Sequence, residues 1–163
     1  MAQDIEQLEL TLVLKGYQGF LKELKEKILS SQLKAAILVN RELITLYWDV
    51  GSKILQKQKN EGWGAKTIQN LARDLKCALT EMKGFSLTNI KYMVQFAKEY
   101  PDFTISQQLV GQIPWGHNIV LLQKLKSVEE RLWYAKKTIE NGWSRSVLLH
   151  WLDSNLHKRE GRS

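Results

Sequence analysis

The sequence predicts an all-α fold: a multi-helix domain with a long N-terminal helix and a pair of helices like a helix-turn-helix. Over most of the chain, apolar residues recur at steps of three and four, which places them on one face of a helix. The two prolines, Pro101 and Pro114, both follow such patterns. One short stretch near the N-terminus alternates as a strand does, but no second strand is found to pair with it.

The long helix is expected from about Tyr17 to about Gln58. The residues predicted to share one face of it are Ala36, Val39, Leu43, Tyr47, Val50 and Ile54. Unbroken, it would be about 60 Å long at 1.5 Å per residue, longer than a small domain is wide. It therefore either pairs with another chain or breaks near Ser30–Ser31, and we favour a largely continuous helix.

The first 16 residues are treated as a separate segment, and residues 17–163 as a single helical domain. In that first segment Leu8, Leu10, Leu12 and Leu14 recur with period two, which is typical of a half-buried strand. A lone strand leaves its backbone groups unpaired. The segment is therefore strand-like and paired with a partner chain, disordered, or helical, and the pattern leaves these three alternatives open.

Five further helices are expected after the glycines that flank Trp63. They are placed at about 65–79, 86–100, 115–126, 128–141 and 144–158, with residues 102–113 as a loop holding at most a short helical turn. Ser86 and Ser144 are predicted N-caps and Gly142 a C-cap. Pro101 is expected to end the second of these helices.

Composition bounds the class of protein. A chain of 163 residues is expected to form one domain with a substantial core. The single cysteine, Cys77, forms no internal disulfide, and this favours a reducing compartment. No run of about 18 apolar residues is present, and the first residues lack the basic region of a signal peptide. We expect a soluble, cytoplasmic protein.

Positive charge is concentrated in one stretch. The chain has a net charge of +7, and residues 53–98 hold nine Lys or Arg against three Asp or Glu. In the same stretch, two amphipathic helical patterns are joined by a short connection that contains glycine. A concentration of positive charge on a helix pair indicates nucleic acid as the partner.

The second helix of that pair is the candidate for reading a groove. Its inward stripe is predicted to be Leu87, Ile90, Met93, Val94 and Ala97, which leaves polar residues outside. Asn and Gln can form paired hydrogen bonds with an adenine edge, and lysines contact phosphates. The predicted nucleic-acid-binding residues are Lys66, Arg73, Lys76, Lys83, Thr88, Asn89, Lys91, Tyr92 and Gln95, with Lys53, Lys57 and Lys59 extending the basic patch. The alternative is an ordinary solvated helix face, in which Asn89 bonds the preceding turn.

Other chemistry is not supported by the residues. The three histidines, His117, His150 and His157, lack the spacing of metal ligands, and no cofactor or small-molecule substrate is indicated. Cys77 is interpreted as a structural thiol. The tryptophans beside glycines, Trp63, Trp115 and Trp143, are interpreted as pinning helix junctions rather than as platforms for bases.

Several long segments carry a resemblance to a known family. They are VNRELITLYWDVG (39–51), GWGAKTIQNLARDL (62–75), GFSLTNIKYMVQFAKEY (84–100), residues 113–148 and LHKREG (156–161). Together they resemble the amino-terminal domain of the YhcG-like bacterial family. The resemblance implies that this domain precedes a nuclease domain of the PD-(D/E)XK type, and that the present chain stops where that half would begin.

The resemblance also raises the question of catalysis within this chain. Three tripeptides satisfy the (D/E)xK pattern, beginning at Glu23, Asp74 and Glu81. That chemistry needs carboxylates and a lysine on adjacent strands around Mg²⁺, whereas these triplets fall in or between helices. We therefore expect no enzyme activity.

Two functions follow as hypotheses. The first is a non-catalytic domain that binds nucleic acid, with DNA favoured, and that positions a nuclease in full-length relatives. The alternative is an interaction or dimerisation module without direct nucleic-acid contact, forming a homodimer through the long N-terminal helix.

Overall fold

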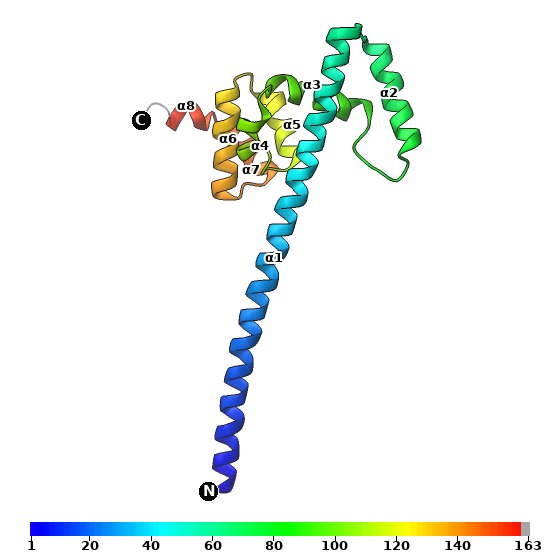
Figure 1. The fold of residues 1–163 in the computed structure, drawn as a ribbon. Helices are drawn as coiled ribbons and strands as arrows, with labels where there is room; N and C mark the ends of the chain where they lie inside the picture. The colour runs from blue at the N-terminus through cyan, green and yellow to red at the C-terminus, as the bar shows by residue number, and fades with distance from the viewer. Residues whose placement is uncertain (161–163) are drawn as a thin grey trace. The chain divides into compact units, whose positions relative to one another are not determined.

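The computed structural model describes residues 1–160 of the chain. Its eight helices are drawn in Figure 1, and no strand occurs within those residues. The prediction of an all-α fold with a long N-terminal helix is confirmed. The bounds are α1 (Ala2–Glu61), α2 (Ala65–Ala78), α3 (Leu87–Glu99), α4 (Phe103–Val110), α5 (Trp115–Lys124), α6 (Val128–Asn141), α7 (Arg145–Asp153) and α8 (Leu156–Glu160).

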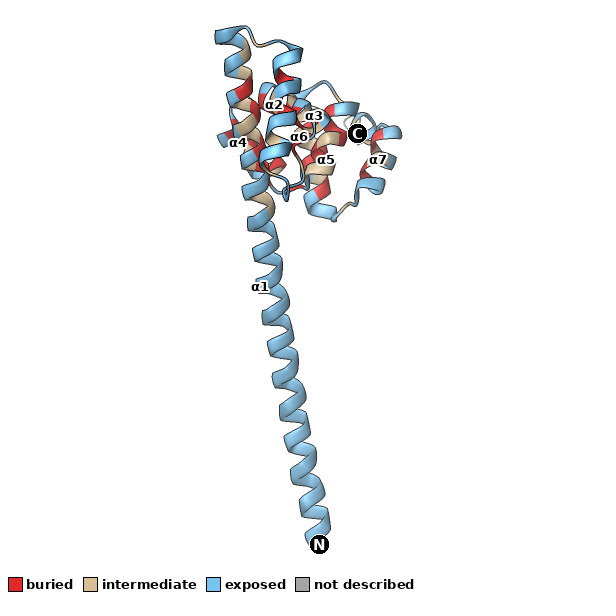
Figure 2. Cartoon of the chain, turned by 90° about the vertical axis from the view of Figure 1, so that its right-hand side faces the viewer, coloured by how far each residue is buried: buried red, intermediate tan, exposed pale blue. Residues whose placement is uncertain are grey.

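The chain divides into two units, Met1–Val39 and Asn40–Ser163, and α1 contributes to both. The first unit is helical from Ala2 onward, with no break near Ser30–Ser31. Of the alternatives left open for residues 1–16, the structure has the helix, so the strand-like interpretation was wrong. The alternating leucines do not form a strand because no second strand is present among the described residues to satisfy their backbone groups. Every residue of this unit is exposed (Figure 2).

The second unit buries one face of α1 whose residues follow steps of three and four. The buried residues are Ile44, Tyr47, Gly51 and Ile54. Of the residues predicted to share one helix face, Tyr47 and Ile54 are buried, whereas Val39 (70 % exposed) and Leu43 (37 % exposed) are not. Gly51 marks the closest packing, since a Cβ at this position would overlap the carbonyl of Met93 in α3. Gly51 is therefore part of the buried face of α1, although a pattern of apolar side chains does not predict it.

Two hydrophobic clusters form the core of the second unit. The smaller one joins the end of α1 to α2 and α3 and holds Tyr47, Ile54, Ile68, Ala72, Phe85, Ile90 and Met93. The larger one gathers Ile44 of α1, the end of α3 and helices α4 to α7. Trp115 packs against both, with its ring centroid 4.9 Å from that of Tyr47 and 5.2 Å from that of Phe96. One tryptophan thus connects the two clusters.

Helix ends follow the predicted caps. The hydroxyls of Ser86 and Ser144 accept hydrogen bonds from the backbone N–H groups three residues on, and so does that of Ser127. Gly142 ends α6 with φ +62°, the left-handed conformation that favours glycine at this position.

Two expectations after residue 100 were wrong. The loop expected at 102–113 contains the eight-residue helix α4, which buries Phe103, Ser106 and Val110 at helical spacing. The helix expected at 144–158 is interrupted after Asp153, because Asn155 adopts φ +54°, a left-handed conformation that asparagine tolerates. Gly161, the last residue of the LHKREG segment, lies outside the described residues.

Candidate nucleic-acid interface

The predicted interface is built on α2, α3 and the connection between them. That connection runs from Leu79 to Ser86 and is longer than the three- or four-residue turn of a helix-turn-helix. The expectation of a short turn was wrong in this respect. The two helices nevertheless pack together: Ile68 and Ala72 of α2 share a cluster with Ile90 and Met93 of α3.

The linings of two surface grooves show how the pair is arranged. A groove of about 270 Å³ has Arg73 and Lys76 of α2 beside Ser86 and Leu87 at the start of α3. A second, of about 250 Å³, is lined by residues that include Ala65 at the start of α2 and Lys91 in α3. The last turns of α2 therefore lie beside the start of α3, and the first turn of α2 beside its middle. Cationic side chains border both grooves.

The cations of the predicted patch are exposed and mostly free of intramolecular ion pairs. Within the described residues, no salt bridge is made by Lys53, Lys59, Lys66, Lys76, Lys83, Lys91 or Lys98, and all seven are exposed. Arg73 lies 3.7 Å from Asp74, a pair in which both side chains are about 70 % exposed and which contributes little. Their charge is available to a polyanion.

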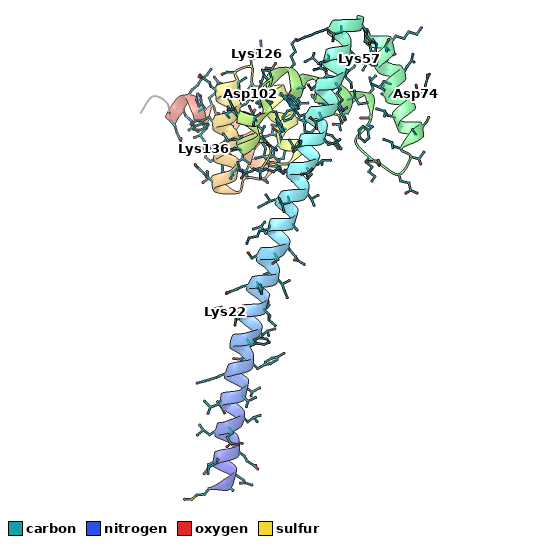
Figure 3. All side chains as sticks on the ribbon, in the orientation of Figure 1. Lys22, Lys57, Asp74, Asp102, Lys126 and Lys136 are labelled. Carbon is teal, nitrogen blue, oxygen red and sulfur yellow. The ribbon has the colours of Figure 1, made fainter. Side chains whose placement is uncertain are left out.

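The end of α1 forms a third groove with α2, of about 440 Å³, lined by Lys53, Lys57, Trp63 and Leu71 among others. Lys57 bonds Glu61 at 2.8 Å and lies 5.9 Å from the centre of the Trp63 ring. The Lys57 ammonium is the main cause that lowers the pKa of Glu61. Lys57, labelled in Figure 3 with Asp74 of α2, is thus already engaged within the protein.

The predicted residues of α3 separate into two groups. Thr88 and Lys91 are exposed and Gln95 is half-buried; their spacing places them on one outward face. Asn89 and Tyr92, both half-buried, are turned toward α5. The Tyr92 hydroxyl accepts a hydrogen bond from Nε2 of Gln123 at 2.6 Å, which leaves the outward face of α3 to Thr88, Lys91 and Gln95.

Asn89 is held within the fold on both sides of its amide. Its Nδ2 donates to the carbonyl of Gly84 at 2.6 Å, and its Oδ1 accepts from Nε1 of Trp115 at 2.7 Å. A side chain that reads an adenine needs both groups free. The alternative, in which Asn89 bonds the preceding turn, is what the structure has, and Trp115 is the partner that sequence reasoning missed.

Tryptophans at helix junctions act in packing. Trp115 connects the two clusters, and Trp143 stacks on Trp151 with centroids 6.0 Å apart while its carbonyl bonds Nε2 of His117 at 2.9 Å. Trp63 is only partly buried and donates to Glu61 at 3.1 Å. The packing interpretation therefore holds for Trp115 and Trp143. Trp63 instead lines two of the surface grooves described above, those of about 440 and 250 Å³.

The three (D/E)xK triplets do not lie on strands in the described part of the chain. Glu23 and Asp74 lie within α1 and α2, and Glu81 lies in the connection, so none of the three triplets has the strand setting of a nuclease. Residues 1–160 contain no group of three or more His, Cys, Asp or Glu that could hold a metal ion. Cys77 is exposed.

Comparison with known proteins identifies the family. Residues 23–159 match the model of the DUF1016 N-terminal domain. The chain belongs to this family. It is also similar to the protein named "Putative nuclease YhcG" of Escherichia coli (strain K12), with 22 % identity over 176 aligned positions that cover 88 % of the chain and 46 % of that relative. The predicted resemblance to the YhcG-like amino-terminal domain is confirmed.

The DUF1016 match covers most of this chain, but the chain covers only part of its relative. The chain spans less than half the length of the relative it matches. No solved structure is significantly similar to it. Across residues 1–160, no helix combines the length and apolar character needed to cross a bilayer.

Proposed function

We propose that the DUF1016 N-terminal domain of this chain binds nucleic acid, with duplex DNA favoured, through the α2–α3 pair and without catalysing a reaction. In full-length relatives it would position a nuclease domain on its substrate. The observation that supports the proposal is the set of exposed cations that border the two grooves of this pair. Lys76 and Lys91 make no ion pair within the described residues, and Arg73 makes only the solvent-exposed one with Asp74.

Binding through phosphates rather than bases is what the side chains favour. Asn89 and Tyr92 are engaged by Gly84, Trp115 and Gln123, so few polar groups on α3 are available for base edges. Lysine and arginine contacts to phosphates displace counterions and carry no sequence information by themselves. We therefore expect weak sequence preference and strong dependence on salt.

The test compares two sets of charge removals. One variant changes Lys66, Arg73, Lys76 and Lys91 to Gln. The control removes four exposed cations elsewhere in the second unit, changing Lys126, Lys136, Arg145 and Lys158 to Gln. Binding of labelled duplex DNA, single-stranded DNA and RNA is measured by fluorescence anisotropy between roughly 50 and 200 mM salt, the range over which such contacts lose most of their affinity.

For wild type, a patch that neutralises about five phosphates gives a log–log salt slope of roughly −4 to −5. The α2–α3 variant should flatten this slope by about 3 to 4, while the control should change it little. Equal losses in the two variants, or no binding by wild type, would reject the proposal. Tighter binding of single strands or RNA would reject the preference for duplex DNA.

A further inference from the structure

The helix of the first unit carries a regular apolar stripe whose residues are exposed. Six residues follow alternating steps of four and three, the heptad spacing of a coiled-coil seam. They are Leu10 (59 % exposed), Leu14 (51 %), Tyr17 (61 %), Leu21 (45 %), Leu24 (39 %) and Ile28 (55 %). The stripe is about 27 Å long at 1.5 Å per residue. A helix in water with an apolar seam of this length is stabilised when a second helix covers it.

Charge along the same helix is divided between its two ends. Residues 1–14 contain three acidic side chains, Asp4, Glu6 and Glu9, and no Lys or Arg. Residues 15–34 contain five lysines against two glutamates. Two such helices side by side in the same direction would place like charges together, whereas opposite directions place the acidic half of each on the basic half of the other.

We propose that a second copy of this chain covers the stripe, with the two helices antiparallel. The spacing of the six residues is symmetric about Gly19, so one antiparallel register pairs every member of the seam. Leu10 lies opposite Ile28 of the second copy, Leu14 opposite Leu24, and Tyr17 opposite Leu21. Each pair occurs twice, as a two-fold axis requires.

Residues that flank the seam fit the same register. With Leu14, Leu21 and Ile28 at heptad position a, residues 6, 20 and 34 are at position g. The g positions of two antiparallel helices meet one another, which places Glu6 beside Lys34 of the second copy. Phe20 then meets its own copy at the two-fold axis and widens the apolar contact. In a parallel pair Glu6 would meet Thr11, and Phe20 would meet Lys25, so the side chains favour the antiparallel arrangement.

The first experiment measures the mass of the full chain by sedimentation equilibrium. Wild type is expected to be a dimer, and Leu14→Glu a monomer at the same concentration. The matched control is Leu12→Glu, which makes the same change on the same helix at a residue that is 61 % exposed but outside the stripe, and it should remain dimeric. A monomeric wild type, a larger oligomer, or equal effects of the two substitutions would overturn the proposal.

The second experiment tests whether the two helices are antiparallel. It introduces cysteines instead of a glutamate, so its result does not depend on how a charged residue affects the helix. In a Cys77→Ser background, chains with Leu14→Cys are mixed with chains with Leu24→Cys and oxidised. An antiparallel pair gives a disulfide between residues 14 and 24, located by peptide mass mapping. Disulfides that join 14 to 14 and 24 to 24 would show a parallel pair and overturn the proposed direction. The absence of cross-links would overturn the seam itself.

Discussion

The indole N–H of Trp115 donates a hydrogen bond to Oδ1 of Asn89 over 2.7 Å. Since Nδ2 of Asn89 also donates to the carbonyl of Gly84, one amide ties the connection before α3 to the start of α5. Gly84 has φ +107°, a conformation that other residues rarely adopt, so the connection is shaped by a glycine and then fixed by the asparagine. The residue best suited by type to read a base is thus a structural residue.

Replacing this amide should cost stability. Asn89→Ala leaves the Trp115 N–H and the Gly84 carbonyl without partners, and we expect the free energy of unfolding to fall by about 1–3 kcal/mol. Urea denaturation followed by circular dichroism measures the change. Thr88→Ala is the control, because Thr88 is exposed and makes no recorded side-chain hydrogen bond in the described residues; it should change stability by less than about 0.5 kcal/mol. An equally stable Asn89→Ala would contradict the structural role.

A single methyl group at Gly51 should be tolerated poorly. The added Cβ would overlap the backbone carbonyl of Met93, which cannot rotate away, so α1 and α3 must separate. For Gly51→Ala we expect a loss of about 3 kcal/mol in the free energy of unfolding, at the upper end for an overpacked core.

Gly19→Ala provides the comparison in the same helix. A Cβ at Gly19 meets nothing within 4 Å, and alanine favours the helix over glycine by about 0.5–1 kcal/mol. This variant should have equal or higher helix content by circular dichroism. If Gly51→Ala were as stable as wild type, the close approach of α1 to α3 would be wrong.

Periodicity explains why most of the fold could be predicted. Helices α2, α3, α5 and α6 carry regular apolar stripes between residues that cap or interrupt helices, so local sequence fixes them to within two residues at each end. Helix α4 was missed because it has only two turns and buries a serine, Ser106, among its inward residues. The break before α8 depends on a left-handed asparagine, Asn155, in a pattern that otherwise continues as a helix.

The candidate site could be predicted less well, because it depends on contacts between distant residues. Exposure of Lys66, Lys76 and Lys91 follows from helix faces alone. The engagement of Asn89 and Tyr92 depends on Trp115 and Gln123, which lie 26 and 31 residues away, and no local pattern indicates it. Base-reading candidates need tertiary information of this kind, whereas phosphate-binding candidates do not.

The buried hydroxyl of Tyr100 should make the fold sensitive to alkali. Burial raises the pKa of Tyr100 to about 12, from an ordinary value near 10. The folded state therefore holds this proton more tightly than the unfolded state. The associated stability is complete below pH 10 and declines as the pH rises from about 10 to 12, by about 2–3 kcal/mol for one such group.

Tyr100→Phe isolates this effect from the titration of lysines. The hydroxyl has no partner at hydrogen-bonding geometry within the described residues, and the nearby Arg131 guanidinium offsets only part of the effect of burial on its pKa. The variant should therefore lose less than about 1 kcal/mol at pH 7.5. Between pH 10 and 12 its stability, measured by urea unfolding, should fall less steeply than that of wild type. Parallel curves for the two proteins would refute the assignment to Tyr100.

The side chain of Arg131 is almost fully buried, with 2 % exposure. It donates to the carbonyl of Leu125 at 3.2 and 2.7 Å and to Oε2 of Glu99 at 3.0 Å. Glu99→Ala would leave a buried charge without its counterion; because Glu99 is itself 31 % exposed, we expect a cost of about 2–3 kcal/mol, below the range for a fully buried pair. Replacing both residues, as Arg131→Met with Glu99→Ala, removes the uncompensated charge. The double variant should cost less than the sum of the single changes Arg131→Met and Glu99→Ala by at least about 1 kcal/mol. Strict additivity in this cycle, measured by urea denaturation, would show that the two side chains are close without being energetically coupled.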